Sequence, residues 1–169
     1  MKKGVSTVGL EASGLWYLPD LGMFAVVSDE TERKRPELFL MDSSGSIESK
    51  SIVEKVSSIN DMEGITGDPR GRLYLLASQS HNRKGKLPAQ RRLLVRMQRR
   101  GTGFLADASV ALIDLLAEAA AAAPETDWAR FINRAVREKT ADIEGIAWFV
   151  GRVIKWPGLY VTGIGWLAA

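Results

Sequence analysis

The sequence contains no cysteine and only one histidine, His81. Without cysteine the chain cannot form a disulfide, a thiolate metal site or a cysteine nucleophile, and a single histidine excludes a multi-histidine metal site. The GxSxG, HExxH, GxxxxGK[ST] and GxGxxG patterns are also missing, so no standard hydrolase elbow, zinc protease or nucleotide-binding loop is indicated. A bound metal ion would therefore be held mainly by oxygen ligands.

Long apolar runs are missing as well. No run approaches the ~18 residues of a membrane helix. Glu11 interrupts the N-terminal stretch before the roughly 7–15 apolar residues that an export signal needs. We therefore expect no membrane segment and no signal peptide here, and the compartment stays open. With 169 residues, 46% of them hydrophobic and 25% charged, the chain is suited to one domain with a buried core.

The sequence does contain a repeat. Residues 11–30, EASGLWYLPDLGMFAVVSDE, align without a gap over residues 61–80, DMEGITGDPRGRLYLLASQS. The alignment places Gly14 over Gly64, Pro19 over Pro69, Phe24 over Tyr74 and Ser28 over Ser78. A third copy, DIEGIAW, begins at Asp142 after an insertion of about 30 residues. The glycines of the three copies are more simply backbone requirements than ligand contacts.

Each copy continues with short β-rich runs separated by turns that contain Pro or Gly. After the first run, further runs cover residues 23–27, 38–41 and 47–53, and then 73–77, 93–97 and 104–110. Four strands in a period of about 50 residues are typical of a propeller blade. We predict a mainly β fold, a partial β-propeller of about two and a half four-stranded blades in a single domain.

The predicted boundaries follow from the repeat. Blade one covers about residues 9–56, blade two about 59–107, a helical hairpin about 108–138, the start of blade three 141–148, and an atypical tail 149–169. In the insertion, Trp128, Phe131, Ile132, Ala135 and Val136 have helical spacing, and Pro124 ends the helix before them. The hairpin is either a decoration on the rim or a lid. A propeller needs at least about four blades to close, so we expect a truncated or frame-shifted product, self-association, or a different fold.

Propeller geometry predicts a site at one end of the strands. The start of a blade's first strand and the end of its second strand lie on the same face, which groups the acids of the repeat with the residues that end the second strands. The predicted metal ligands are Glu11, Asp61, Glu63, Asp142 and Glu144. The predicted substrate-binding residues are Asp29, Glu30, Ser80, Arg83, Lys84 and Lys86, and His81 is the candidate acid or base.

Converging carboxylates repel one another, and a bound cation, a raised pKa or basic partners relieve the repulsion. Oxygen ligands favour a hard cation, with Ca²⁺ the first choice and Mg²⁺ the second. The simpler alternative is that Asp61 and Asp142 bond nearby backbone amides and lock the turns. Ser13 stands where Glu63 and Glu144 stand in the other copies, so the acidic ring is not uniform.

Basic residues are concentrated between His81 and Arg100, where eight Lys or Arg occur without an acid. Nucleic acid would be attracted by such a patch, but no aromatic residue is interleaved to stack on bases. A solvated hairpin whose charges protect a strand edge is therefore the preferred interpretation.

The ordered motifs EASGL, DMEGI, SQSHNRKGK and DIEGIAW resemble those of bacterial phytase-like and SdiA-regulated-like β-propellers, including related domains of unknown function. The resemblance covers roughly residues 9–148. It implies a six- or seven-bladed propeller about twice this length, often exported. From the acidic face we expect a metal-dependent esterase or phosphoesterase that acts on a small anionic molecule, although catalysis itself stays open. A non-catalytic binding propeller and a nucleic-acid binder are the alternatives.

Overall fold

The computed structural model describes residues 10–148 and 159–162. The first four strands are β1 (Ala12–Leu18), β2 (Met23–Ser28), β3 (Glu37–Met41) and β4 (Ile47–Glu54). The next four are β5 (Met62–Gly67), β6 (Arg72–Ala77), β7 (Leu93–Arg100) and β8 (Gly103–Ala111). Two helices follow, α1 (Leu112–Ala122) and α2 (Asp127–Glu138), and then β9 (Gly145–Trp148) and β10 (Leu159–Thr162).

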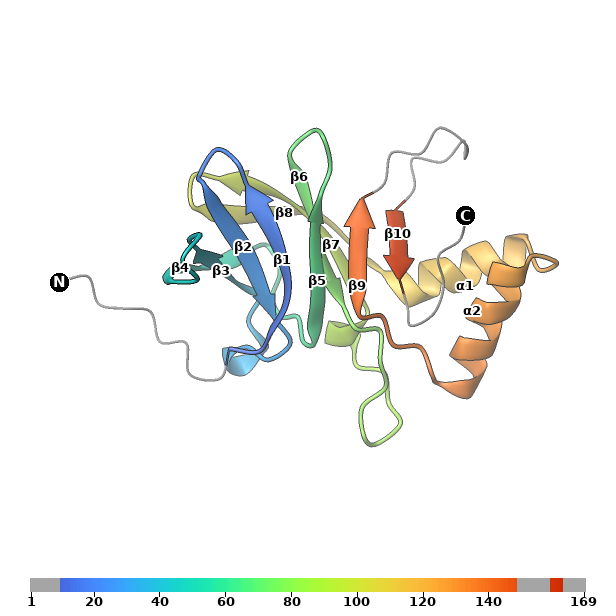
Figure 1. The fold of residues 1–169 in the computed structure, drawn as a ribbon. Coiled ribbons are helices and arrows are strands. Elements are labelled where there is room, and N and C mark those ends of the chain that lie inside the picture. The colour runs from blue at the N-terminus through green and yellow to red at the C-terminus, as the bar shows by residue number, and fades with distance from the viewer. Residues whose placement is uncertain (1–9, 149–158, 163–169) are drawn as a thin grey trace.

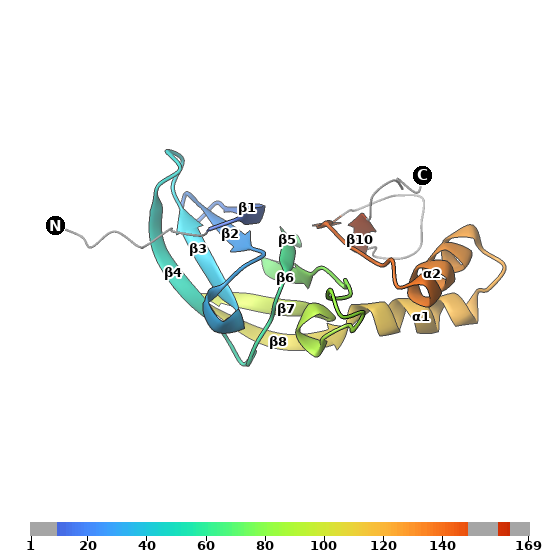
Figure 2. The ribbon, with the colours of Figure 1, turned by 90° about the horizontal axis from the view of Figure 1, so that it is seen from below.

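The strands confirm the prediction of a mainly β fold. β1–β4 and β5–β8 are two antiparallel four-stranded units, which we call the first and second units. A short parallel pairing of β4 with β8, at Val53 with Phe104 and Glu54 with Leu105, joins them into one eight-stranded sheet. The sheet curls until its two end strands, β1 and β5, meet, so it resembles a nearly closed barrel (Figures 1 and 2).

The main core lies between the two units. Each unit turns one apolar face toward the other, and the buried side chains there include Val27, Leu38, Leu40, Leu75, Val95, Met97 and Phe104. The second unit is apolar on its other face as well. There Leu76 and Leu94 pack against Leu112 of α1 and Ile143, just before β9. The second unit is therefore covered on both faces, and the residues of its strands β5 and β6 are almost continuously buried.

Glycines let the first strands of the repeats approach closely. A Cβ on Gly14 would lie 3.0 Å from the Cα of Gly64, and a Cβ on Gly64 would lie 3.0 Å from the backbone nitrogen of Ile146 and 3.3 Å from the Cα of Gly145. β1, β5 and β9 therefore lie side by side and point the same way (Figure 1). For Gly14 and Gly64 these distances agree with the expectation of a backbone requirement.

The gapless alignment of the repeat is wrong for the second strand. Gly14 pairs with Val27, whereas Gly64 pairs with Leu76, so Val27 corresponds to Leu76. The amide of Asp29 donates to the carbonyl of Glu11, and the amide of Ser78 donates to the carbonyl of Asp61, so Asp29 corresponds to Ser78.

The turn explains the shift. Ladder pairing closes at Leu18 with Met23 in the first unit, while in the second the Asp68 amide donates to the Arg72 carbonyl, so the second turn is one residue shorter. A shift of one residue exchanges the faces of a strand. The matches of Phe24 with Tyr74 and of Ser28 with Ser78 therefore join residues on opposite faces.

The helical hairpin begins later than predicted. Residues 108–111 continue β8, because they extend the ladder with β7 up to the pair Leu93–Ala111, and α1 starts at Leu112. The apolar face predicted for α2 is only partly buried: Ala135 is buried, but Trp128, Phe131 and Val136 remain 44%, 46% and 39% exposed. No helix in the described ranges is long and apolar enough to cross a membrane.

The tail contains one described strand. The sequence predicted an atypical tail over residues 149–169; within it residues 159–162 form β10, whose backbone pairs antiparallel with all four residues of β9. The rest of the predicted tail, residues 149–158 and 163–169, and residue 9 of the predicted blade one lie outside the described residues.

A buried glutamine replaces the missing cap of α1. The preceding residue, Ala111, has no side chain that could accept from the first turn. Instead Gln79, which is fully buried, accepts the amide of Ile113 at 3.1 Å and donates to the carbonyl of Ala77 at 2.8 Å. Gln79 thereby fixes the start of α1 against the end of β6.

The close approach of the first strands predicts that Gly64→Ala destabilises the fold. The added methyl would press on the backbone of β9, which cannot move as a side chain can, so we expect a loss of about 1–3 kcal/mol in the free energy of unfolding. Gly103→Ala is the matched control, because its Cβ would meet only the Arg100 carbonyl at 3.4 Å. Urea unfolding measures both, and an equal effect of the two substitutions would contradict this account.

The cap predicts that Gln79→Met also destabilises the chain. Methionine is similar in size but leaves the Ile113 amide and the Ala77 carbonyl without a partner, which costs about 1–3 kcal/mol. Gln90→Met is the control, because the half-buried Gln90 side chain makes no hydrogen bond within the described part of the chain. Thermal unfolding followed by circular dichroism compares them. A Gln79→Met protein as stable as the control would exclude the capping role.

Candidate functional site

The first strands begin, and the second strands end, at one end of the curled sheet, which we call the acidic end. Backbone hydrogen bonds tie these segments together: the Asp61 amide donates to the Asp29 carbonyl at 3.0 Å, and the Ile143 amide donates to the Ser78 carbonyl at 2.7 Å. The segments that carry Asp61, Glu63, Asp142 and Glu144 are thus neighbours, although they come from two separate copies of the repeat.

Asp61 is held in a closed polar network. Its Oδ2 accepts from the hydroxyls of Ser78 and, at 3.1 Å, of Ser80, and its Oδ1 lies 3.0 Å from Nη2 of Arg91. Arg91 also donates to the Ser80 hydroxyl at 2.8 Å. Asp61 adopts a left-handed backbone with φ of 62°. These contacts fix Asp61 at the strand end, but through two hydroxyls and a guanidinium, whereas the alternative predicted backbone amides as its partners.

Glu63 is the most perturbed carboxyl group of this end. Burial raises its pKa to about 7, and the negative charges of Glu144, Asp61, Asp29 and Asp142 add to the shift. Within the described residues no ion pair to Glu63 offsets these charges. Its proton is therefore exchanged near neutral pH, whereas a free glutamic acid is fully ionised there.

Asp142 and Glu144 show the same effect. Burial raises the pKa of Asp142, the charge of Asp61 raises it further, and Arg91 opposes the change. Burial also raises the pKa of Glu144, followed by the charges of Asp142 and Asp61. The side chains of Asp142 and Glu144 share a hydrogen bond, which raises the pKa of Glu144 and lowers that of Asp142. We call Asp61, Glu63, Asp142 and Glu144 the carboxylate cluster.

Two predicted acids stay apart from this cluster. Glu11 and Glu30 are exposed, and no described interaction joins their side chains to the four carboxylates. Glu11 instead takes part through its backbone, whose amide donates to the Ser28 hydroxyl at 3.2 Å. Asp29 adds its charge to the surroundings of Glu63, but its Oδ1 accepts the Glu30 amide at 2.6 Å. The cluster therefore has fewer members than the sequence predicted.

The predicted basic partners are also placed differently. Arg83, Lys84 and Lys86 are exposed on a compact loop, in which Asn82 Oδ1 accepts the amides of Lys84 and Lys86 at 2.9 and 3.1 Å. Among the described residues, these three side chains make no contact with the carboxylate cluster. His81 is half-buried, and its Nδ1 is buried without a hydrogen-bond partner.

Arg91 is the cation that does reach the cluster, and sequence reasoning did not select it. Arg91 ends a short 3-10 helix, Ala89–Arg91, which backbone bonds hold against the acidic end. The Gln79 amide donates to the Arg91 carbonyl at 2.8 Å, and the Asn60 amide donates to that of Gln90 at 3.1 Å. No local pattern in the sequence indicates this return of the chain.

Within residues 10–148 and 159–162, no group of three or more His, Asp or Glu side chains is arranged to hold a metal ion. Arg91 and two hydroxyls already surround Asp61, so a cation would have to be bound mainly by Glu63, Asp142 and Glu144 after their side chains rotate.

Known proteins add no family to these observations. No protein-family model matches the chain, and no curated protein and no solved structure matches it. The resemblance to phytase-like propellers therefore stays a prediction.

The raised pKa of Glu63 predicts how stability depends on pH. The folded state holds the Glu63 proton up to about pH 7, whereas the unfolded chain releases it near 4.5. Stability from this group is therefore fully present below the unfolded pKa and is lost as the pH rises through 7. Glu63→Gln stays neutral, so we expect the variant to match the wild type at pH 5. At pH 8 it should melt higher by about 2–4 °C, or about 1 kcal/mol after solvent screening.

Melting curves from pH 5 to 8 test this expectation. Glu30→Gln is the control, because Glu30 lies at the same end but is exposed and outside the cluster. If Glu63→Gln shifts the melting temperature equally at pH 5 and pH 8, then Glu63 is not titrating in the folded protein.

Proposed function

We propose that the chain is part of a β-propeller whose acidic end binds a hard divalent cation, Ca²⁺ first and Mg²⁺ second. The observation that carries the cation site is the gathering of Glu63, Asp142 and Glu144 beside Asp61, with raised pKa values. Carboxylates that repel one another in this way bind a cation favourably, because the ion removes the repulsion and supplies the missing positive charge.

The propeller is supported by the stacking of the units. Two four-stranded antiparallel units lie face to face, their first strands touch at equivalent glycines, and β9 with β10 repeats the pairing of β1 with β2. Blades stacked around an axis are joined in this way. The parallel pairing of β4 with β8 is short, because it includes only two residue pairs.

The uncovered face of the first unit is evidence for a further partner that packs on it, either another blade or a second copy of the chain. Ile65 of the second unit is 5% exposed because the first unit covers it, while its equivalent Leu15 is 56% exposed and the neighbouring Tyr17 is 47% exposed. The same surface that is an interface in the second unit is therefore apolar and open in the first.

In a larger propeller the cation would polarise a phosphoryl or carbonyl oxygen and activate water, which gives a metal-dependent esterase or phosphoesterase for small anionic molecules. His81, whose Nδ1 has no partner among the described residues, is the candidate acid or base. Arg83, Lys84 and Lys86 stay candidates for binding the anion. Their exposed loop would have to fold toward the cluster.

A non-catalytic binding propeller is the second candidate. The contacts of Asp61 with Ser78, Ser80 and Arg91 favour it, because they give that carboxylate a structural role. Nucleic-acid binding is less well supported. Four of the eight basic residues between 81 and 100 are paired with acids: Arg91 with Asp61, Arg92 with Asp114, Arg96 with Asp107, and Arg99 with Asp20.

Calorimetric titration of Ca²⁺ at pH 8 and pH 6 tests the cation site. We expect binding at pH 8 that is up to about tenfold weaker at pH 6, because the Glu63 proton competes with the ion. The double variant Glu63→Gln/Glu144→Gln should lose binding, whereas Glu11→Gln should retain it because Glu11 stands apart. Absence of binding at pH 8, or equal loss in the Glu11→Gln control, contradicts the proposed site.

Hydrolysis of p-nitrophenyl phosphate and p-nitrophenyl acetate, with Ca²⁺ and with a chelator, then separates the two candidate functions. Calcium-dependent turnover that disappears in the double variant supports the esterase. Calcium binding without turnover supports the binding propeller.

A further inference from the structure

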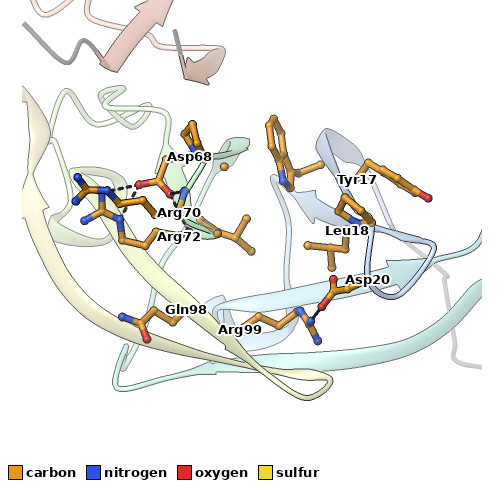
Figure 3. A pocket seen from close by; sticks show the side chains of 14 residues that line it. Tyr17, Leu18, Asp20, Asp68, Arg70, Arg72, Gln98 and Arg99 are labelled. Carbon is orange, nitrogen blue, oxygen red and sulfur yellow. Dashed lines mark hydrogen bonds and ion pairs between the residues drawn. The ribbon is translucent and has the colours of Figure 1, made fainter. Parts of the chain in front are cut away.

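A pocket lies at the opposite end of the strands, between the β1–β2 turn and the β5–β6 turn (Figure 3). Its volume is about 750 Å³, and it is lined by residues 16–20 and 67–73 together with Gln98 and Arg99. Small-molecule sites typically measure about 300–1,000 Å³ and occur where structural units meet. The pocket is therefore large enough for a metabolite-sized ligand, and it is separate from the carboxylate cluster.

The pocket has an aromatic wall because Gly67 has no side chain. The ring of Trp16 occupies the space beside Gly67, since a Cβ there would lie 2.7 Å from both Cε2 and Nε1 of the indole. Trp16 also packs against the main core, which holds the ring in place. Pro19, Pro69 and Leu73 add further apolar surface to the lining.

Three guanidinium groups line the pocket, and two of them are already neutralised. Asp68 is buried and accepts from Nε of Arg72 at 2.6 Å, and its Oδ1 accepts the amides of Arg70 and Arg72. Arg99, on the other side, is paired with Asp20 (Figure 3). Both pairs fix the walls of the pocket but leave no net charge.

Arg70 is different, because its side chain is exposed and makes no ion pair within the described residues. Only its backbone is fixed, by the hydrogen bond to Asp68 at 2.9 Å. It therefore leaves one uncompensated positive charge at the rim of a pocket whose wall is aromatic and apolar. An arginine of this kind forms forked hydrogen bonds with a carboxylate or a phosphate.

We propose that this pocket binds a small organic anion with a flat apolar body, whose carboxylate or phosphate pairs with Arg70 and whose body packs on Trp16. The inference rests on the pocket alone and is independent of the proposed cation site. Flat rings stack favourably on an indole, and the guanidinium supplies the charged contact that fixes orientation.

Proton–nitrogen NMR of the full chain tests the pocket with benzoate and phenyl phosphate as probes. The indole Nε1–H signal of Trp16, assigned by its loss in Trp16→Phe, should shift with dissociation constants in the millimolar range, about 1–10 mM. Benzylamine, the cationic counterpart, should not shift it. Inorganic phosphate should bind more weakly than phenyl phosphate, because it lacks the flat body.

Variants of Arg70 decide whether its charge holds the anion. Arg70→Gln should weaken benzoate binding at least threefold, about the loss of one exposed charged contact, and Arg70→Lys should restore part of it. The turn should survive both changes, because its hydrogen bonds use the Arg70 backbone. Arg134→Gln, an exposed arginine on α2 that does not line the pocket, is the matched control and should bind like the wild type.

Gly67→Ala provides a second test, because its methyl should displace Trp16 and reduce binding even with Arg70 intact. The proposal is overturned if no probe shifts Trp16 up to about 10 mM. It is also overturned if benzylamine binds as well as benzoate, or if Arg70→Gln binds like the wild type.

Discussion

The contact between the first strands of the repeats determines both the fold and the acidic end. β1, β5 and β9 approach one another through backbone atoms at Gly14, Gly64 and Gly145, and a Cβ on Gly14 or Gly64 would press on the neighbouring strand. The same glycines directly follow the position of Glu63 and Glu144. Because the backbones meet, the carboxyl groups one residue earlier are brought within electrostatic reach of each other. The packing of the strands and the repulsion of the acids are thus one feature of the repeat.

The acids of the carboxylate cluster differ in how far neighbouring groups compensate their negative charge. Arg91 and the hydroxyls of Ser78 and Ser80 surround Asp61, which leaves this carboxylate fixed as part of the strand end. Glu63 has no such partner in the described structure. The cost of burying its negative charge near other carboxylates is therefore offset only by a proton or by a cation. A residue that locks the structure and a residue that is free to exchange a proton therefore lie two positions apart.

Much of the strand order could be predicted from the sequence, because turns with Pro and Gly separate short β-rich runs at a regular period. The register of the second strand could not. Val26 and Val27 point to opposite faces of β2 and are both buried, and the same holds for Leu75 and Leu76 of β6. A shift of one residue therefore leaves the apolar pattern unchanged. The missing residue lies in the turn, which closes at Leu18 with Met23 in the first unit and at Asp68 with Arg72 in the second. Arg91 escaped prediction for a related reason, since only long-range backbone bonds bring it to Asp61.

The basic stretch from 81 to 100 shows that a run of charges indicates a function only once the ion pairs of its residues are known. Acids distant in sequence neutralise Arg91, Arg92, Arg96 and Arg99, so the stretch supplies ion pairs to several parts of the sheet. Arg83, Lys84 and Lys86 of the same stretch remain exposed without an ion pair in the described structure. Outside the stretch, Glu63 at one end of the strands and Arg70 at the other also lack an ion pair among the described residues. Because the strands hold these two ends apart, a cation at one and an anion at the other would bind without competing for the same groups.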